Sequence, residues 1–417
     1  MKSKNVVVIG AGPAGLMAAI AASENPNNRV ILIEKNTEAG RKLLLTGGGR
    51  CNVTNNCSVD QLIKNTVTNG KFLFSCVNIF NNENLMGFFN DNGLKLKTEE
   101  GGKVFPITDK AKNVLQVLIK KLEDNNVEVI YDSEVKELVV NENVIDGVML
   151  INNKFIKADS VILSTGGMSY PKTGSTGSGY KILRKLGHTI VEIKPGLVPI
   201  EAKEEWIKSL MGISLENTNI VCNIKDKEKL NKKPKTIKWT GPLIFTHYGI
   251  SGPAVLNLSS YINKYIDNSL IEIIIDLIPT VSMQQLENIF ISKDIDKNET
   301  IFKNLSKILP KNLVLKLLEV INIEKDKKIS DISKEESLKL IGSIKALKIT
   351  PKGLRSISEA IITSGGGSVK EIDPKTMESK LVKGLYLAGE IIDIDAITGG
   401  YNLQIAFSTG YTAGINA

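Results

Sequence analysis

A glycine-rich turn between two short apolar runs constrains this chain more than any other feature of its sequence. The run Val6–Ile9 leads directly into Gly10-Ala11-Gly12-Pro13-Ala14-Gly15, and an alanine-rich helical stretch follows to Ser23. A second apolar run, Val30–Ile33, ends in Glu34. Strand, turn, helix, strand and acid in this order and spacing are the fingerprint of a dinucleotide-binding βαβ unit.

Each residue of this fingerprint has a mechanical reason. Gly10 permits the tight turn, Gly12 lets the backbone approach a pyrophosphate, and Gly15 lets the helix pack against the strand. The free amides and positive dipole end of the helix favour phosphate groups. Glu34 is placed to bind both hydroxyls of an adenosine ribose.

A secretory signal is the rival interpretation, because Lys2 and Lys4 precede a long apolar stretch that ends in small residues. A signal core needs neither three glycines at fixed spacing nor a charged strand end at Glu34, so we favour the dinucleotide site. No uninterrupted apolar run is long enough to span a bilayer. We therefore expect a cytoplasmic protein.

The net charge of +8 raises the question of an anionic partner such as nucleic acid or a membrane. The basic residues are scattered, however, and the small clusters at Lys225–Lys238 and Lys325–Lys328 are interleaved with acids. No basic stripe alternates with aromatic residues. We expect a small-molecule substrate, no nucleic-acid partner and no membrane span, and the sequence leaves the oligomeric state open.

The four cysteines, Cys51, Cys57, Cys76 and Cys222, include no pair separated by two residues. This spacing argues against a redox-active disulfide beside a flavin and against a zinc site, so we predict no metal centre. Buried, reduced thiols are the simplest interpretation, with Cys51 notable for its glycine-rich surroundings.

The periodicity of apolar residues and the spacing of turn residues predict an α/β fold of the Rossmann-like two-dinucleotide-domain type with an inserted domain. Residues 1–193 read as the first part of a FAD-binding domain and include an antiparallel meander between residues 135 and 157. Residues 194–346 read as an insertion, β-rich over 194–280 and helical over 281–346. Residues 347–417 return to the FAD-binding domain and end in a second glycine-rich block.

FAD is favoured over NAD because further glycine-rich segments follow apolar runs, at Thr165-Gly166-Gly167 and at Gly389-Glu390. FAD is long, and a protein that binds it extended needs contacts from several strand ends. The meander fits a segment that closes over adenine, where Val135 contributes its backbone. Glu390 is expected to hold the ribityl hydroxyls.

Three segments strongly resemble the BaiN/YhiN-like (aminoacetone oxidase-like) family of bacterial NAD(P)/FAD-dependent oxidoreductases. They are Gly40–Asn55, which contains Thr46-Gly47-Gly48-Gly49-Arg50-Cys51-Asn52; Phe245–Pro253; and the end segment from Glu371 to Gln404. The resemblance covers nearly the whole chain and implies a FAD domain with a β-plus-helical insertion. The family includes members called aminoacetone oxidases and members implicated in reducing unsaturated bile acids or steroids.

Roles for single residues follow from the fingerprint and the resemblance. Arg41 and Lys42 are placed for pyrophosphate oxygens, Thr46 and Asn52 for the flavin N5 edge, and the start of the last helix for the flavin O2 side. The predicted cofactor-binding positions are Gly10, Gly12, Pro13, Ala14, Gly15, Glu34, Lys35, Arg41, Lys42, Thr46, Gly48, Gly49, Asn52, Val135, Thr165, Gly166, Gly389, Glu390, Gly400, Tyr401, Asn402 and Leu403.

The predicted catalytic residues are His247, Arg50 and Tyr401. Arg50 is expected to face a substrate carboxylate or carbonyl, and His247 is a candidate proton donor, although a structural hydrogen bond explains it equally well. Tyr170, Asp393 and Asp395 are further acid candidates, and a capping role explains His188. Gly174–Gly179 lacks the dinucleotide spacing and reads as a helix entry, so NADH or NADPH would dock transiently.

Three functions follow as alternatives. The first is NAD(P)H-driven reduction of an activated C=C bond in an apolar, steroid- or bile-acid-like substrate by flavin hydride transfer. The second is a FAD-dependent amine oxidase of the aminoacetone type that uses O2. The third is a non-enzymatic flavin-bearing binding protein, prompted by the net charge.

Overall fold

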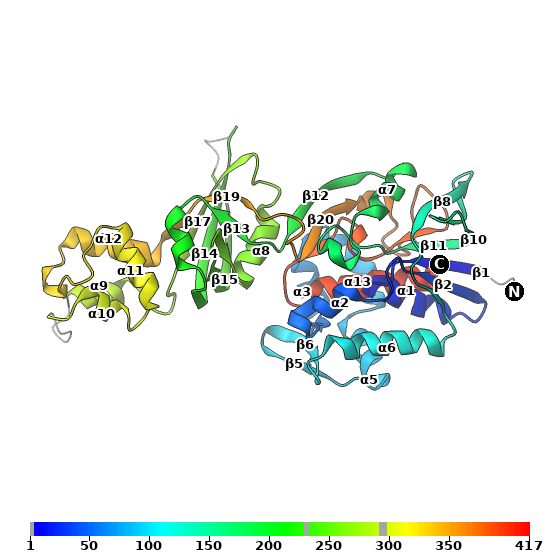
Figure 1. Cartoon of the computed structure of the whole chain (residues 1–417), viewed down its shortest axis with the longest axis horizontal. Coiled ribbons are helices and arrows are strands. Elements are labelled where there is room, and N and C mark those ends of the chain that lie inside the picture. The colour runs from blue at the N-terminus through cyan, green and yellow to red at the C-terminus, as the bar shows by residue number, and fades with distance from the viewer. Residues whose placement is uncertain (1–3, 229–232, 292–297) are drawn as a thin grey trace. The chain divides into compact units, whose positions relative to one another are not determined.

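The chain forms two compact units. The computed structural model describes residues 4–228, 233–291 and 298–417, so residues 229–232 of the basic cluster Lys225–Lys238 lie outside the described ranges. Unit 1 combines Met1–Gly196 with Ile357–Ala417, and unit 2 comprises Leu197–Ser356. In Figure 1 the N-terminal segments, in blue, and the C-terminal segments, in red, accordingly interleave within one unit.

A five-stranded parallel sheet forms the centre of unit 1, in the order β21-β11-β1-β2-β7. The strands are β1 (Lys4–Ile9), β2 (Asn28–Ile33), β7 (Glu128–Ile130), β11 (Ser160–Leu163) and β21 (Leu385–Leu387). Val7 of β1 pairs with Ile31 on one side and with Val161 on the other. The strand order reverses between β1 and β11, because later strands lie on both sides of β1. Folds of this kind bind nucleotides at such a reversal.

Helix α1 (Pro13–Ser23) packs closely against the last helix, α13 (Tyr401–Asn416). Gly410 and Gly414 of α13 make the approach possible. A Cβ atom at Gly410 would lie 2.2 Å from the carbonyl oxygen of Ala14, and one at Gly414 would lie 2.4 Å from that of Ala18. The two ends of the chain therefore build one layer beside the sheet.

Shorter elements surround this core. Helix α6 (Ala111–Asp124) buries Val114, Leu115, Leu118 and Leu122 and contacts α1, as its amphipathic spacing predicts. The predicted meander is β8 (Val135–Asn141), β9 (Val144–Leu150) and β10 (Phe155–Lys157). The others are α2 (Arg41–Leu45), β3 (Thr54–Asn55), α3 (Val59–Lys64), β4 (Thr66–Thr68), α4 (Phe74–Ile79), α5 (Asn82–Asp91), β5 (Leu96–Thr98), β6 (Lys103–Pro106), α7 (Ser178–Lys185), β12 (Ile190–Gly196), β20 (Ile362–Gly367) and β22 (Asp395–Ala396).

Unit 2 is built on a seven-stranded antiparallel sheet, in the order β18-β17-β14-β15-β16-β13-β19. Its strands are β13 (Ile200–Ala202), β14 (Ser214–Asp226), β15 (Lys235–Phe245), β16 (Gly249–Ser251), β17 (Ser269–Asp276), β18 (Leu347–Ile349) and β19 (Pro351–Leu354). The terminal strands β18 and β19 are separated by Thr350 alone, so one stretch of chain supplies both ends of the sheet.

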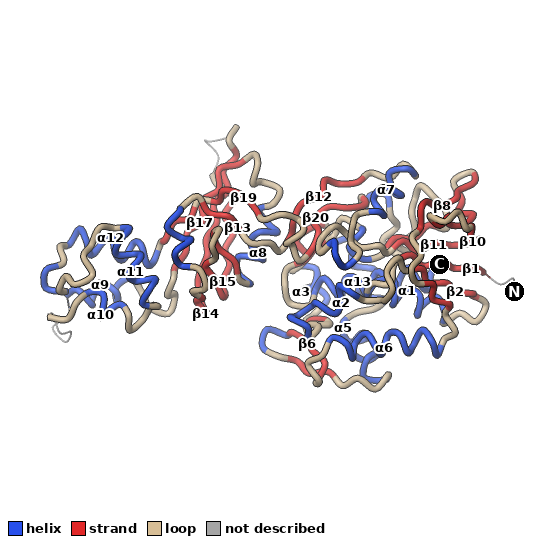
Figure 2. The backbone as a smooth tube through the Cα atoms, viewed as in Figure 1, coloured by secondary structure: helices blue, strands red, loops and turns tan. Residues whose placement is uncertain are grey.

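The described residues of unit 2 also form the α-helices α8 (Pro253–Ile262), α9 (Met283–Ile291), α10 (Ile301–Leu305), α11 (Lys311–Val320) and α12 (Lys334–Lys345). Figure 2 shows α9–α12 grouped together beyond the strands of the unit. The sequence predicts an insertion over residues 194–346, whereas unit 2 runs to Ser356 because β18 pairs with β17 and β19 pairs with β13. None of the helices in the described ranges has the length and apolar composition needed to cross a membrane.

Candidate functional site

The loop between β1 and α1 has the geometry of a phosphate-binding turn. Gly10 adopts a φ of 99°, and a Cβ atom there would lie 2.7 Å from the carbonyl oxygen of Ser164. A Cβ atom at Gly15 would lie 1.8 Å from the carbonyl oxygen of Gly10. Around Gly12, by contrast, no described atom lies within 4 Å of the Cβ position. The backbone is thus packed at two glycines and open at the third, where a pyrophosphate would approach.

The amino end of α1 is free to receive an anion. Gly12 is its N-cap, Pro13 occupies the first turn, and no side chain of the described residues caps the helix or places an acid in that turn. Its first amides and positive dipole end are therefore available to phosphate oxygens.

Glu34 lies buried at the carboxyl end of β2 and is held firmly by its neighbours. Its Oε2 accepts a 2.8 Å hydrogen bond from the Ala11 amide, and its Oε1 accepts bonds of 2.8 and 2.6 Å from the amide and side chain of Asn36. Since two carboxylate oxygens offer about four acceptor sites, some capacity for a ribose hydroxyl remains. Lys35, next in the chain, donates 2.9 Å to the hydroxyl of Thr176 in the 174–179 turn.

Thr165 and Gly166 follow β11, directly beside the glycine loop. The Thr165 hydroxyl is buried and has no hydrogen-bond partner within the described part of the chain. Gly166 has a φ of 70°. A buried hydroxyl without a partner carries a free-energy cost that a polar ligand would relieve. Val135, the predicted adenine contact, begins β8 and is buried.

A partly buried charge cluster joins the segment after β2 to the end block. Lys42 Nζ lies 2.6 Å from a Glu390 carboxylate oxygen and 2.6 Å from the Ser169 hydroxyl. The other Glu390 oxygen accepts 2.6 and 3.0 Å hydrogen bonds from the Thr363 amide and Ser169. Burial alone would raise the pKa of Glu390, but the Lys42 charge and these hydrogen bonds lower it overall.

Two residues with predicted cofactor roles form an ion pair in this cluster. The sequence predicts Lys42 at the pyrophosphate and Glu390 at the ribityl hydroxyls, and the structure pairs the two side chains with each other. Ser169 and Thr363, which complete the cluster, carry no motif that sequence analysis could use. Arg41, the other predicted pyrophosphate ligand, contacts Glu38, Asn36 and Thr37.

The segment Thr46–Asn52 contains several residues with left-handed backbone. Gly47, Gly48 and Gly49 have φ values of 57°, 66° and 87°, and Cys51 has 63°. At Gly48 and Gly49 no described atom would meet an added Cβ, and both residues are exposed, so the backbone here borders open space. Thr46 Oγ1 donates to the Leu43 carbonyl, and Asn52 Oδ1 accepts from the Val104 amide. The local polar groups are thereby fixed while the glycines stay accessible.

Cys51 is fully buried in this segment, and burial raises the pKa of its thiol to about 12. Cys51 therefore stays protonated at neutral pH and is no thiolate nucleophile. Within the described residues no group of three or more histidine, cysteine or acidic side chains is arranged to hold a metal ion.

Arg50 belongs to a network of four charges that the sequence analysis missed. Its guanidinium contacts the carboxylates of Glu99 and Asp109 and lies 4.0 Å from the centre of the Phe105 ring. Lys97 contacts the same two acids, at 3.3 and 2.7 Å. Any substrate group that binds Arg50 therefore competes with two carboxylates. The partners follow Arg50 by 49 and 59 residues, so no local pattern could have revealed them.

The glycine-rich end block meets the first glycine loop. Gly389 has a φ of 75°, and a Cβ atom there would lie 2.7 Å from the Cβ of Ala14. Gly400, the N-cap of α13, has a φ of 98° and lies so close to the backbone of Thr54 that a Cβ would come within 2.3 Å of its carbonyl oxygen. The predicted sites at the two chain ends are thus brought together.

Tyr401, Asn402 and Leu403 form the first turn of α13. The Asn402 side chain donates to the carbonyls of Ala396 and Ile397 and accepts from the Ala396 amide, which fixes the approach to the helix. Tyr401 is 6% exposed, and burial raises the pKa of its hydroxyl. Tyr401 therefore stays protonated over the physiological pH range.

The two histidines lie in different units. His247 is exposed in the turn between β15 and β16 of unit 2, beside Tyr248 with 4.6 Å between ring centres. His188 is buried in unit 1, where Nε2 lies 2.9 Å from Ser379 Oγ and Nδ1 lies 3.3 Å from Glu371. Arg50 and Tyr401 belong to unit 1 and His247 to unit 2, so two of the three predicted catalytic residues lie in the same unit.

These features fit FAD. The space over Gly12 suits a pyrophosphate, the Thr165 hydroxyl lacks a partner within the described residues, and the accessible backbone at Gly48 and Gly49 suits a flat ring. The fold and the site together define a nucleotide-binding flavoprotein oxidoreductase of the Rossmann type.

The chain belongs to the HI0933-like family, whose Rossmann-domain model matches residues 4–416. It is 31% identical over 411 residues to a 3-dehydro-bile acid delta(4,6)-reductase of Clostridium scindens, covering 98% of this chain and 97% of that protein. It is also 31% identical over 415 residues to a ribosomal RNA dihydrouridine synthase of Haemophilus influenzae, with 98% and 97% covered. The predicted family and fold class are confirmed.

Solved structures share the fold. A 3-ketosteroid-delta4-(5alpha)-dehydrogenase from Rhodococcus jostii RHA1 superposes with a TM-score of 0.52 and 14% identity, covering 100% of this chain and 96% of that one. A flavocytochrome c3 fumarate reductase gives a TM-score of 0.51 and 16% identity, with 100% and 78% covered.

Proposed function

We propose that this protein holds FAD and reduces a C=C bond conjugated to a carbonyl, with NADH or NADPH as the electron donor. One observation carries the proposal. Two relatives that match nearly the whole chain are named for different substrates, a 3-dehydro bile acid with delta(4,6) double bonds and uridine in ribosomal RNA. Both substrates contain a double bond conjugated to a carbonyl group, so the reaction type is what the two names share.

The chain would hold the cofactor with groups already described. Gly10, Gly12 and the first turn of α1 would bind the pyrophosphate, and Glu34 the ribose. The open backbone at Gly48 and Gly49 and the start of α13 would border the ring. Bound FAD supplies the hydride chemistry, which no amino-acid side chain can provide.

The protein must then orient the substrate and move one proton. Tyr401 is the stronger candidate donor in unit 1, because its buried hydroxyl stays protonated. Arg50, held between Glu99 and Asp109, would orient a carbonyl rather than exchange a proton, since the hydrogen bonds that it donates to Glu99 and Asp109 raise its pKa further. His247 remains a candidate from unit 2. A transient docking of the nicotinamide donor follows from the absence of a second fingerprint in the sequence.

Two substrate classes follow from the relatives. An apolar, steroid- or bile-acid-like enone is the substrate predicted from the sequence. A uracil ring in RNA is the second candidate, favoured by the H. influenzae relative and by one named as a ribosomal RNA dihydrouridine synthase of Escherichia coli, 29% identical over 414 residues. These relatives favour a nucleic-acid partner, whereas the sequence predicts none.

Anaerobic flavin spectroscopy tests the proposal. NADH or NADPH should bleach the flavin absorbance, and a 3-oxo-Δ4 steroid or a uridine-containing RNA should restore it. If neither nucleotide bleaches the flavin, the donor is wrong. If the reduced protein is reoxidised only by O2 and makes peroxide from aminoacetone, the amine-oxidase alternative replaces the reductase. Tyr401→Phe should slow reoxidation by the acceptor and leave bleaching unchanged.

A further inference from the structure

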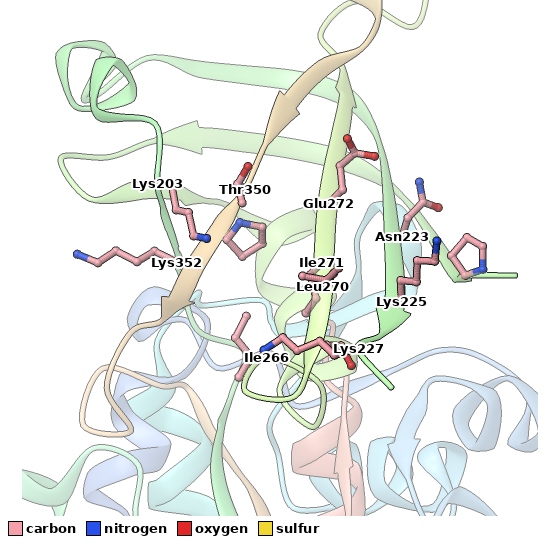
Figure 3. A pocket seen from close by; sticks show the side chains of 13 residues that line it. Lys203, Asn223, Lys225, Lys227, Ile266, Leu270, Ile271, Glu272, Thr350 and Lys352 are labelled. Atoms are coloured by element: carbon pink, nitrogen blue, oxygen red, sulfur yellow. The ribbon is translucent and has the colours of Figure 1, made fainter. Parts of the chain in front are cut away.

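Unit 2 carries a groove lined by lysines that the reaction does not use. Lys203, Lys225, Lys227 and Lys352, here called the lysine groove, border a cavity of about 450 Å³. Figure 3 shows Lys203 and Lys352 on one side of it and Lys225 on the other. This volume lies within the range of about 300–1,000 Å³ typical of ligand sites.

The antiparallel sheet explains why these side chains face outward together. Along β14, Cys222 and Ile224 are buried while Asn223 and Lys225 alternate with them on the opposite face. On the neighbouring β17, Leu270 pairs with Lys225 and Glu272 with Asn223. The side of the groove that carries Lys203 is fixed by a 2.9 Å hydrogen bond, which the Lys203 amide donates to the Thr350 carbonyl.

The groove has a large surplus of positive charge. Among the residues that the structure describes, none of the four lysines forms an ion pair with a carboxylate. Glu272 is the one acid of the lining, and it lies 3.0 Å from Lys348, which offsets its charge. Four ammonium groups around one hollow outnumber the single acid of its lining and attract an anion with several charges.

We propose that the lysine groove binds the phosphate backbone of RNA, an inference that rests on the proposed function in its RNA form. Lysines on opposite walls suit a ligand with repeated charges, whereas a bile-acid carboxylate would engage one of them. The lining contains no aromatic side chain for base stacking, so the groove contacts the backbone and not the base sequence. Ile266 and Leu270 offer an apolar floor for sugar edges.

Fluorescence anisotropy with a labelled RNA hairpin that has a uridine-rich loop tests this on the full-length flavoprotein. The triple variant K203Q/K225Q/K352Q should bind the hairpin at least about tenfold more weakly. Its dependence of log affinity on log salt should become shallower by about 2 to 3, since each lost phosphate contact removes about 0.7 to 0.9. Glu272→Gln removes the acid of the groove and should tighten binding.

The matched control is K311Q/K325Q/K334Q, which removes the same charge from exposed lysines in the helical part of unit 2. Equal affinities of the groove and control variants would overturn the proposal. Retention on phosphatidylserine vesicles without RNA binding would overturn it too, by assigning the groove to a membrane. Reduction of 2-cyclohexenone by the unaltered protein is measured separately, so that a failed reaction and a failed groove can be told apart.

Discussion

Gly12 and Gly15 stand three positions apart and need glycine for opposite reasons. Gly15 has no room for a Cβ, while Gly12 has room that a ligand would use. We expect Gly15→Ala to destabilise unit 1 by about 2–3 kcal/mol through overpacking. Gly12→Ala should leave the melting temperature of the apoprotein unchanged and weaken FAD binding by about tenfold or more. Flavin titration and calorimetry of both variants separate the effects, and a destabilised Gly12→Ala would contradict this assignment.

The Lys42–Glu390 pair gives a second prediction for single residues. Lys42→Met would leave a largely buried carboxylate without its counter-ion, and we expect a loss of about 1–3 kcal/mol in the free energy of unfolding. The double variant K42M/E390Q should recover most of the loss, because the uncompensated charge is then gone. Urea denaturation of the apoproteins measures both. Additive losses in the double variant would show that the pair is not coupled.

His188 makes the free energy of unfolding depend on pH. Burial lowers the pKa of His188, and Glu371 opposes the shift only in part. The unfolded chain therefore binds the proton first, near pH 6.5, and stability falls as the pH drops below that value. We expect His188→Gln to remove this component of the stability curve between about pH 7 and pH 5.5. His247→Gln changes an exposed histidine and should retain it.

For single residues, the sequence predicts those features that depend on neighbouring positions in the chain. The fingerprint predicts a tight turn at Gly10 and close packing at Gly15, and the structure shows both, because they depend on local backbone geometry. The charge network of Arg50 and the pairing of Lys42 with Glu390 join residues that are far apart in the chain, and carboxylates and lysines at a surface are too common to signal such partners.

Among the elements, the contact between α1 and α13 depends on two mid-helix glycines. A Cβ at Gly410 would meet the backbone of α1, and we expect Gly410→Ala to cost about 2–3 kcal/mol and to displace the phosphate-binding turn. Gly342, in the middle of α12, has no described atom near its Cβ position. Gly342→Ala should therefore stabilise unit 2 by about 0.5–1 kcal/mol. Denaturation followed by circular dichroism checks both, and equal effects would refute the packing argument.

Most elements follow from periodicity, including α6 and the meander β8–β10. Helices α4 and α5 follow one another with only Phe80 and Asn81 between them. Asn81 caps α5 by a reciprocal hydrogen-bonded pair with Asn84, and this local interaction starts a new helix. Membership of a sheet is harder, since nothing in residues 347–354 says which strands they pair with.

At the scale of the whole molecule, unit 2 is inserted in the chain between the two parts of unit 1. This arrangement predicts that the two units can fold separately. The chain enters and leaves unit 2 at neighbouring points, because the Arg355 amide donates 3.1 Å to the Pro199 carbonyl. We expect residues 197–356 expressed alone to fold cooperatively, with Trp206 and Trp239 as fluorescent reporters. Unit 1 with these residues replaced by a short Gly-Ser linker should still bind FAD. An unfolded fragment, or a unit 1 that no longer binds FAD, would contradict this separation.

The same nesting dictates an order of events during synthesis. Unit 2 is complete once the ribosome has passed Ser356, whereas unit 1 waits for β21 and α13. At about 5–20 residues per second, residues 357–417 take roughly 3–12 seconds to make. Throughout that interval the apolar surface of α1 that α13 will cover is exposed. Helix α1 is thus made early but is among the last elements to be covered, and chaperone dependence should concentrate there.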